Sequence, residues 1–447
     1  MNKTVRKLKT LMNNYNLYSS ALLKKFITEN PENLGLNDLS IISELSNVNR
    51  MDTAAYYTDW ETTEMIYKKL PEINKSIIYI LEPSVGIGNF LDIIIRKYKN
   101  KKKVIIDVID IDQNSISILK LLNTYRHIPD NVQIRFIVND FLKTNIKCRY
   151  DLIIGNPPFL KKSKVKDWKI LAKEFNDHIS TNLSSLFLQK SIENADNIMM
   201  IMPKYFLSNN DFSLARERCE NYAIDCIIDF GEKGFKGVLI ETIAILINTV
   251  HYPNKTESIS ITKDFSINLE QKKMIDKNFP NWLIYRNDFF DEIAQKMEFD
   301  IFDVFRDREI TTKLLNGENG IRVLKSKNIS RDGTRIINIK GYDSFINEKQ
   351  LSKLSISQFR YNSDVFLVPN MTYYPRIIKK PYNCIVNGSL AILINKTNKV
   401  ITQSNLDFIN SDTFTEFYAI ARNYSTRSLN IDKNSVQYFG IYKGEIN

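Results

Sequence analysis

Seven short apolar segments, separated by stretches long enough for helices, lie between residues 77 and 247. In order they read IIYILEP, VIIDVIDID, IRFIVND, YDLIIGNPP, NIMMIMP, IDCIIDF and ETIAILI. Because their apolar residues run on without strict alternation, each segment is predicted to be a strand that is buried on both faces. The intervals suit crossover helices, so the pattern predicts an α/β fold with a doubly wound, mostly parallel sheet.

The rest of the chain is predicted to form three further parts. Its 447 residues exceed what one hydrophobic core usually serves, at about 100–200 residues per domain. Residues 1–50 place apolar side chains at helical spacing and predict a helical N-terminal extension to an α/β domain at 51–255. The polar stretch in 256–300 predicts a linker region. Residues 301–447 predict a second, α+β domain, from IRVLKSKNIS, RIINIKGY, DVFLVPN, CIVNGSLAILI and the helical DTFTEFYAIARNYS.

The positive charge is concentrated in the last third of the chain. The net charge is +11, and residues 301–447 hold 21 Lys and Arg against 13 Asp and Glu, a surplus of 8. Basic excess on a folded segment with aromatic residues is expected of a polyanion-binding protein, because Lys and Arg displace counterions from phosphates. An AT-rich genome, which raises the Lys content everywhere, would give a similar composition without such a partner.

The composition argues against membrane and metal sites. No apolar run approaches the roughly 18 residues of a membrane span, and the basic start lacks the apolar stretch of a signal peptide. The 4 cysteines and 3 histidines show no metal-ligand spacing, which also suits a reducing compartment. We therefore expect a cytoplasmic protein without a bound metal.

A glycine-containing turn, LEPSVGIGNF, follows the first predicted strand and precedes the helix LDIIIRKY. Gly86 and Gly88 would let the backbone approach a ligand at the carboxyl end of a parallel strand, although a tight turn alone would also need glycine. Glu82 disfavours a phosphate at this position, and no Gly-Lys of a P-loop follows. The next strand ends in Asp110, placed for a ribose diol, and a third ends in NDF at 139–141. This set predicts a cofactor that is an adenosine with an amino-acid tail.

A second turn, NPPF, follows the fourth predicted strand. Two prolines would stop a buried strand abruptly, which accounts for Pro157 and Pro158 but not for their neighbours. The Asn156 amide oxygen and the Pro157 carbonyl would offer two acceptors to an exocyclic amino group, and Phe159 would offer a flat face to a base ring. The turn therefore predicts a site for a nucleic-acid base.

The order of motifs over roughly residues 50–250 resembles that of the gamma-class, TaqI-like N6-adenine DNA methyltransferases of restriction–modification systems. The motifs are YYTDW, LEPSVGIGNF, IDID, NDF, DLIIGNPPF, IMPKYFL and GFKGVLIETIAILI. The resemblance implies a Rossmann-like, S-adenosylmethionine-dependent methyltransferase domain at 51–255. It further implies that S-adenosylmethionine is bound by Thr58, Glu82, Pro83, Ser84, Gly86, Gly88, Asp110, Ile111, Asp140, Phe141 and Asn156. The family's usual Tyr-Thr-Pro is Tyr-Thr-Asp at 57–59, which is a departure next to Thr58.

The same resemblance assigns the catalytic role to the NPPF turn. Asn156 and Pro157 match the acceptors for the adenine N6 amino group. Phe159 and Phe235 match the rings that stack on the base after it is flipped out of duplex DNA. With both N–H bonds accepted the nitrogen becomes pyramidal, so catalysis needs positioning rather than a basic side chain. Asn before the two prolines favours adenine over cytosine N4, and no cysteine follows a proline, which excludes cytosine-C5 chemistry.

Residues 301–447 resemble, more weakly, the target-recognition domains of this class. Two groups of residues are predicted to contact DNA, although solvated loops would show the same composition. They are Lys161 and Lys162 after the NPPF turn, and Tyr373, Tyr374, Arg376, Lys379 and Lys380 in the C-terminal third.

The expected function is site-specific N6-adenine methylation of double-stranded DNA by the modification enzyme of a restriction–modification system. Its cognate restriction endonuclease would then be encoded separately. Two alternatives stay open: an RNA base methyltransferase, since some of these also carry Asn-Pro-Pro-Phe, and a catalytically silent DNA-specificity subunit. The large basic C-terminal part favours DNA, and the intact Asn156, Pro157 and Glu82 argue against a silent subunit.

Overall fold

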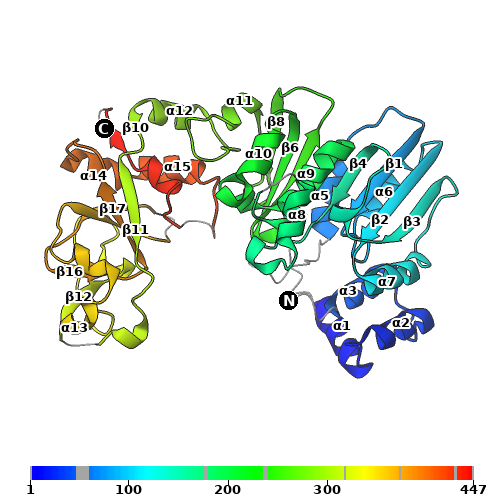
Figure 1. Ribbon diagram of the computed structural model, residues 1–447, viewed down its shortest axis with the longest axis horizontal. Coiled ribbons are helices and arrows are strands. Elements are labelled where there is room, and N and C mark those ends of the chain that lie inside the picture. Colours follow the sequence, from blue (N-terminus) through cyan, green and yellow to red (C-terminus); the bar gives the residue numbers. More distant parts are fainter. Residues whose placement is uncertain are drawn as a thin grey trace. The chain divides into compact units, whose positions relative to one another are not determined.

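The structure is a computed structural model that describes residues 3–46, 60–175, 180–234, 240–316, 319–371, 374–426 and 430–444 (Figure 1). The chain divides into two compact units, Met1–Lys272 and Lys273–Asn447. Each unit has its own sheets and its own hydrophobic core, as expected for a chain of this length.

A nine-stranded sheet forms the centre of the first unit, in the order β3-β2-β1-β4-β5-β7-β6-β8-β9. Its first five strands are mutually parallel, and β7 is antiparallel to both of its neighbours. This mostly parallel arrangement confirms the predicted Rossmann-like α/β fold. The strands are β1 (Ile77–Pro83), β2 (Lys103–Asp110), β3 (Val132–Val138), β4 (Tyr150–Gly155), β5 (Ala195–Pro203), β6 (Ala223–Gly231), β7 (Thr242–Asn248), β8 (Lys255–Ser260) and β9 (Phe265–Glu270).

Helices cover both faces of this sheet. One hydrophobic cluster joins α5, α6 and α7 to alternate residues of the strands, among them Ile78, Ile80 and Ile106. The strand residues between them, such as Leu81 and Ile105, are buried as well, and α9 packs on β5. Burial on both faces explains why the strand sequences lack alternation. The helices are α5 (Trp60–Lys69), α6 (Leu91–Tyr98), α7 (Gln113–Asn123), α8 (Trp168–Glu174), α9 (Leu183–Asn194) and α10 (Ser213–Cys219), with α11 (Gln271–Met274) at the boundary between the units.

The described N-terminal residues, 3–46, form the helices α1 (Lys3–Asn14), α2 (Ser20–Glu29) and α3 (Leu36–Leu45). Their buried side chains share a hydrophobic cluster with Ile118 and Leu122 of α7. Helix α7 directly follows β2 and belongs to the α/β unit. The extension therefore packs on that unit and does not form a separate domain.

The predicted linker at 256–300 is wrong. Most of β8 and all of β9 lie within it, and β8 pairs in parallel with β6, so the large sheet continues to Glu270. Strand β8 was hidden because its polar residues are buried: Thr256, Ser258 and Ser260 are each at most 2% exposed.

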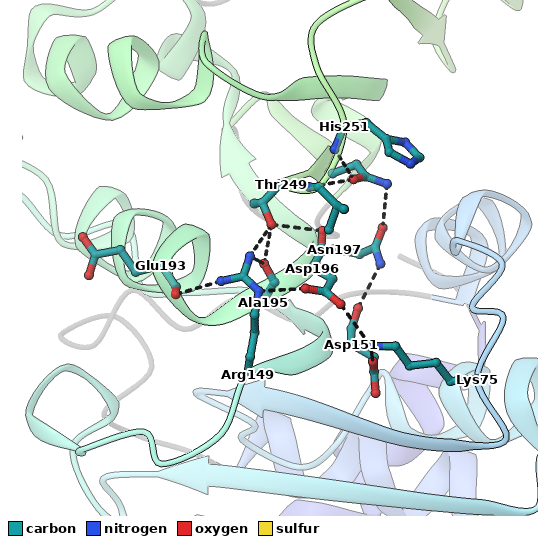
Figure 2. Close-up of polar contacts among 11 residues, drawn as sticks. Lys75, Arg149, Asp151, Glu193, Ala195, Asp196, Asn197, Thr249 and His251 are labelled. Carbon is teal, nitrogen blue, oxygen red and sulfur yellow. Dashed lines mark hydrogen bonds and ion pairs between the residues drawn. The ribbon is translucent and has the colours of Figure 1, made fainter.

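A polar network fastens the edge of the sheet at which β1, β4 and β5 begin (Figure 2). Lys75 pairs with Asp151 at 2.5 Å and with Asp196 at 3.2 Å, and the Arg149 Nε lies 2.7 Å from Asp196. Arg149 also donates to Thr249, at the end of β7. Although burial opposes it, hydrogen bonds from Arg149 and Lys75 hold the pKa of Asp196 below its ordinary value.

The second unit is α+β, with three small sheets in the orders β11-β17-β14-β15, β13-β12-β16 and β10-β18. The segment RIINIKGY, predicted to be part of this domain's regular structure, forms no strand and only one isolated bridge, between Ile336 and Ile329. Its Ile337 carbonyl accepts hydrogen bonds from the side chains of Arg322 and Asn328. Its elements are α12 (Asp288–Gln295), β10 (Met297–Glu298), β11 (Phe302–Arg306), β12 (Ile321–Leu324), β13 (Ser344–Ile346), α13 (Glu348–Leu351), β14 (Val365–Pro369), β15 (Ile378–Lys379), β16 (Cys384–Val386), β17 (Leu390–Asn395), α14 (Gln403–Ile409), α15 (Asp412–Ala421) and β18 (Ile441–Tyr442).

Candidate functional site

Four of the segments singled out in the sequence meet at one edge of the large sheet. The neighbouring strands β3, β2, β1 and β4 are parallel, so their carboxyl ends lie side by side. The segments that leave these ends carry, in the same order, Asp140, Asp110, Glu82 to Gly88, and Asn156 to Phe159. This edge is where open α/β sheets bind their ligands.

The loop after β1 has an unusual backbone. Ser84, Gly86 and Gly88 all have positive φ, at 54°, 55° and 79°. At the φ of Gly88 any other residue would be strained, and an added Cβ would lie 2.7 Å from the Leu119 side chain and displace it. An added Cβ on Gly86 would meet no atom within 4 Å, so this glycine faces open space in which a ligand can approach the backbone.

Asp110 fastens this loop to the end of β2. Its Oδ2 accepts from the Gly86 backbone N–H at 2.9 Å, and its Oδ1 accepts from that of Asp112 at 2.9 Å. Burial raises the pKa of Asp110, and the two backbone donors only partly offset it. Each carboxylate oxygen keeps a second acceptor site, so a ribose diol could be bound beside the loop. The neighbouring Ile111 is 73% exposed at the same strand end.

Glu82 is a buried acid with an unused acceptor. Its side chain is 2% exposed, and its Oε2 has no hydrogen-bond partner among the described residues. Desolvation raises the pKa of this carboxyl well above its ordinary value, against the opposing effect of Arg126. A buried, unpaired carboxylate oxygen at a ligand-binding edge suits a cationic ligand group. Pro83, the last residue of β1, is buried beside it.

The segment after β3 is more tightly packed than the sequence suggested. The Asp140 carboxylate accepts from the Leu142 backbone N–H at 2.9 Å, as a cap of a short turn. The Phe141 ring is 2% exposed and lies 5.2 Å from the ring of Phe187. Asp140 is half-buried and retains acceptor capacity, whereas Phe141 serves the hydrophobic core in this structure.

The NPPF turn adjoins the loop after β1. An added Cβ on Gly155 would lie 3.0 Å from the Pro83 carbonyl oxygen, so the two strand ends are in close contact. Asn156 is half-buried and Pro157 is buried. The Phe159 ring is 8% exposed and belongs to the hydrophobic cluster that contains α5 and α6. Packing in the core therefore competes with the predicted role of Phe159 as a face for a base.

Three predicted site residues, Thr58, Phe235 and Tyr373, lie outside the described residues. Lys161 and Lys162 are exposed immediately after the NPPF turn, as a phosphate contact would require. In the second unit, Tyr374 is 53% exposed, Arg376 is half-buried, and Lys379 is exposed but pairs with Asp364 at 3.4 Å.

The assignment of Lys380 to DNA contact is wrong. Its side chain is 1% exposed, and its ammonium donates to the carbonyls of Arg360, at 3.1 Å, and Pro381, at 2.8 Å. Two hydrogen bonds to backbone oxygens compensate for burying the charge, so Lys380 stabilises the fold and is not available to a phosphate.

Sequence reasoning missed a buried ionic cluster at the same edge of the large sheet. The Lys204 ammonium, just after β5, lies 2.8 Å from the Asp229 carboxylate and 3.6 Å from that of Glu241, and all three side chains are at most 5% exposed. Asp229 also accepts from the Gly231 backbone N–H at 2.9 Å. The cluster thus joins the ends of β5 and β6 to the start of β7. The available signal was a lysine that directly follows a buried strand.

A metal centre and a membrane anchor find no support in the described part of the chain. Among these residues no group of three or more His, Cys, Asp and Glu could hold a metal ion. Cys148, Cys219, Cys226 and Cys384 are all free thiols. None of the helices in the described ranges is long and apolar enough to cross a membrane.

The fold and this edge define a Rossmann-like α/β unit with a ligand site at the carboxyl ends of its parallel strands. Residues 72–235, which contain the loop after β1 and the NPPF turn, match the family model described as Eco57I restriction-modification methylase. The resemblance to restriction–modification methyltransferases is thereby confirmed for this stretch, and the gamma class within them stays a prediction. A methylase family also accords with S-adenosylmethionine, the cofactor predicted from the sequence.

Curated relatives and a solved structure agree with this family. The type II methyltransferase M.AccI of Acinetobacter calcoaceticus is 27% identical over 227 residues, which are 47% of this chain and 39% of that protein. M.HincII of Haemophilus influenzae is 27% identical over 290 residues, 56% of this chain and 53% of that protein. The chain thus spans about half or less of these relatives. The type IIG restriction endonuclease BpuSI shares the fold: 92% of this chain aligns with 61% of that one at 12% identity and a TM-score of 0.50.

Proposed function

We propose that this chain is the modification enzyme of a restriction–modification system, which transfers a methyl group from S-adenosylmethionine to the N6 amino group of an adenine in duplex DNA. One observation carries the proposal. The Asn-Pro-Pro-Phe turn adjoins the loop after β1 at one sheet edge, within the stretch that matches a methylase family. A base-binding turn and a cofactor loop in contact are what methyl transfer between two bound molecules needs.

The residues of the loop after β1 fit the predicted cofactor. The unused Oε2 of Glu82 would accept from the ammonium group of the methionine part, and Asp110 would accept from the ribose hydroxyls. Pro83, Ser84, Gly86 and Gly88 would supply the backbone turn, with Ile111 and Asp140 at the adenine end. When bound, S-adenosylmethionine supplies an electrophilic methyl group on a sulfonium.

The protein's part in the reaction is positioning. The Asn156 amide oxygen and the Pro157 carbonyl would accept the two N–H bonds of adenine N6, which frees the nitrogen lone pair from conjugation with the ring. Alignment of N6 with the methyl carbon then needs no general base for the attack. The thioether S-adenosylhomocysteine would leave with the electron pair of the broken S–C bond, and the methylated nitrogen would lose its extra proton to water. The target base cannot reach this turn from within a stacked duplex, so it must be flipped out, with Phe159 and Phe235 as the proposed stacking rings.

The second unit is proposed to bind the DNA target. Its basic surplus suits a polyanion, and Tyr373, Tyr374, Arg376 and Lys379 are the candidates that the sequence named. Lys161 and Lys162, exposed next to the NPPF turn, would contact the phosphates beside the flipped nucleotide. A cognate endonuclease would be a separate protein.

The test is expression in a bacterial host without DNA methylation, followed by single-molecule sequencing of its DNA. We expect N6-methyladenine at one short sequence in cells that make the natural chain, and none in cells that make an Asn156→Ala variant. Unmodified DNA together with newly methylated RNA would instead identify an RNA base methyltransferase. Unmodified DNA and RNA, despite DNA binding by the purified protein, would favour a silent specificity subunit.

A further inference from the structure

Basic and aromatic side chains from three segments meet on the second unit: the turn after β12, Tyr342, and residues 374–376. The Lys325 ammonium lies 3.8 Å from the centre of the Tyr342 ring, and the Lys327 ammonium lies 5.5 Å from it. The Arg331 guanidinium lies 5.5 Å from the centre of the Tyr374 ring. Arg376 donates to the Ser326 carbonyl at 3.3 Å, which joins the first and third segments. We call this set the basic–aromatic surface; it consists of Lys325, Lys327, Arg331, Tyr342, Tyr374 and Arg376.

Two asparagines, the buried Asn328 and the half-buried Asn410, hold this surface in shape. Asn328 is 0% exposed, accepts from the Lys325 backbone N–H at 2.9 Å, and donates to Ile337 at 3.0 Å. Asn410 accepts from the Ile377 backbone N–H at 2.7 Å and donates back to its carbonyl at 3.1 Å. An added Cβ on Gly333 would lie 2.4 Å from the Asn410 side chain, so the turn and residues 374–378 converge on Asn410. A surface held in place by its own polar groups loses little entropy when it binds.

The charges of this surface are not fully neutralised within the unit. No carboxylate of the described residues lies within salt-bridge distance of Lys327, Arg331 or Arg376, whereas nearby Arg322 is paired with Asp343 at 3.3 Å. One acid, Asp332, lies in the turn. Hydrogen bonds from Ser330 and then Thr334 lower its pKa to about 2, and the bonds from both residues reach Oδ1, so this exposed acid is ionised and offsets part of the positive charge.

We propose that the basic–aromatic surface is where the second unit binds duplex DNA, with Lys327, Arg331 and Arg376 on the phosphates. Cations without a carboxylate partner, clustered with the exposed ring of Tyr374 and the half-buried ring of Tyr342, match the chemistry of a phosphate backbone with bases beside it. The inference rests on the proposed function. It places the contact with DNA phosphates in the turn after β12, whereas the sequence predicted it at Lys379 and Lys380. Lys327 and Arg331 are exposed and Tyr374 is 53% exposed, so the surface is accessible in this unit.

The test compares the salt dependence of DNA binding in three proteins: the natural chain, a Lys327→Gln/Arg331→Gln variant, and a Lys349→Gln/Lys353→Gln control. Lys349 and Lys353 are exposed residues of the same unit outside the surface, so both variants remove two positive charges. The probe is a duplex oligonucleotide that carries the sequence found methylated in the host. The log–log slope of affinity against salt should fall by about one unit for each phosphate that the protein no longer neutralises, and only in the first variant.

The affinity for S-adenosylmethionine, measured by calorimetry on the same preparations, should be equal in all three proteins, which shows that the first unit is intact. An unchanged unfolding transition of the second unit shows that the substitutions leave its fold in place. Equal slopes in both variants, or a reduced slope in the control alone, would overturn the inference. So would a natural chain that binds single-stranded RNA more tightly than the duplex. A natural chain that neither binds duplex DNA nor methylates it would instead refute the proposed function, so the two failures are distinguishable.

Discussion

Replacing Glu82 with glutamine should stabilise the cofactor-free protein while weakening its binding of S-adenosylmethionine. Glu82 is 2% exposed, and its Oε2 has no hydrogen-bond partner among the described residues. Burial raises the pKa of its carboxyl well above the ordinary value. A glutamine of nearly the same shape cannot ionise. The variant therefore removes the cost of a buried negative charge without opening a cavity.

The size of the effect follows from proton linkage. Because the folded-state pKa of Glu82 is raised, the folded protein binds the extra proton, and the associated stability is present at low pH and lost as the pH rises. Between the ordinary and the raised pKa, the free energy of unfolding of the natural protein should fall by about 1.4 kcal/mol per pH unit relative to Glu82→Gln. For a unit of this size that is about 3–5 °C in Tm per pH unit.

Cofactor affinity should change in the opposite direction. A charged hydrogen bond to the ammonium group is worth about 1.5–3 kcal/mol, so the variant should bind S-adenosylmethionine about 10- to 150-fold more weakly. Since binding a cation requires Glu82 to ionise, the affinity of the natural protein should rise with pH, by up to about tenfold per unit. The glutamine variant should lack this dependence.

The assay is calorimetric unfolding of the cofactor-free proteins from pH 5 to pH 8, with cofactor titrations over the same range. Glu29→Gln serves as the matched control, because Glu29 is an exposed glutamate of the same unit. The free energy of unfolding of Glu29→Gln should run parallel to that of the natural protein when plotted against pH. A parallel curve for Glu82→Gln as well would refute the reasoning.

Four further predictions concern both edges of the sheet. Asn156→Ala should abolish methyl transfer and leave cofactor affinity within a few-fold; turnover near that of the natural protein would remove Asn156 from the mechanism. Asp110→Asn should weaken cofactor binding by about 1.5–3 kcal/mol in calorimetry, since one acceptor becomes a donor, and an unchanged Kd would leave Asp110 only its role in the turn. Phe159→Leu should slow methylation more on a fully paired duplex than on one with a mismatch at the target adenine, where unstacking costs less; equal losses would show that the ring only packs the core. Lys75→Met should lower Tm at neutral pH, an effect that shrinks as the pH falls through the lowered pKa of Asp196, because that stability is present only while the acid is ionised. The same variant should keep its cofactor affinity, and a changed Kd would contradict the placement of Lys75 at the far edge.

The main sheet was predictable because its central strands are apolar on both faces. Runs such as YDLIIG and NIMMIMP leave few alternatives to a buried strand between helices. The hairpin of β8 and β9 was not predictable in this way, since KTESIS and FSINLE are polar and alternate weakly. What makes them strands is the pairing of β8 with β6 and of β9 with β8, and a tertiary partner cannot be inferred from local composition.

Some features of the candidate site could likewise be predicted from the sequence, and others could not. Acids and glycines at strand ends could be predicted because strand topology alone brings them to one edge, as for Glu82, Asp110 and Asn156. The burial of long charged side chains could not be predicted. Lys380 resembles a surface lysine in sequence and is buried, and Lys204 was overlooked although it pairs with two buried acids. Whether a lysine is buried depends on carbonyls and carboxylates that lie far away in the chain.

On the proposed function, the contact between Gly155 and Pro83 gives the sheet itself a part in setting the reaction rate. Any side chain at position 155 would meet the Pro83 carbonyl oxygen at 3.0 Å, so β1 and β4 would have to separate by a few tenths of an ångström. On the proposed function, that separation adds directly to the distance between methyl donor and acceptor, and a misplacement of 1 Å can reduce a rate about a hundredfold. Natural selection could thus tune turnover through the spacing of two strands, at a position that never touches the substrate.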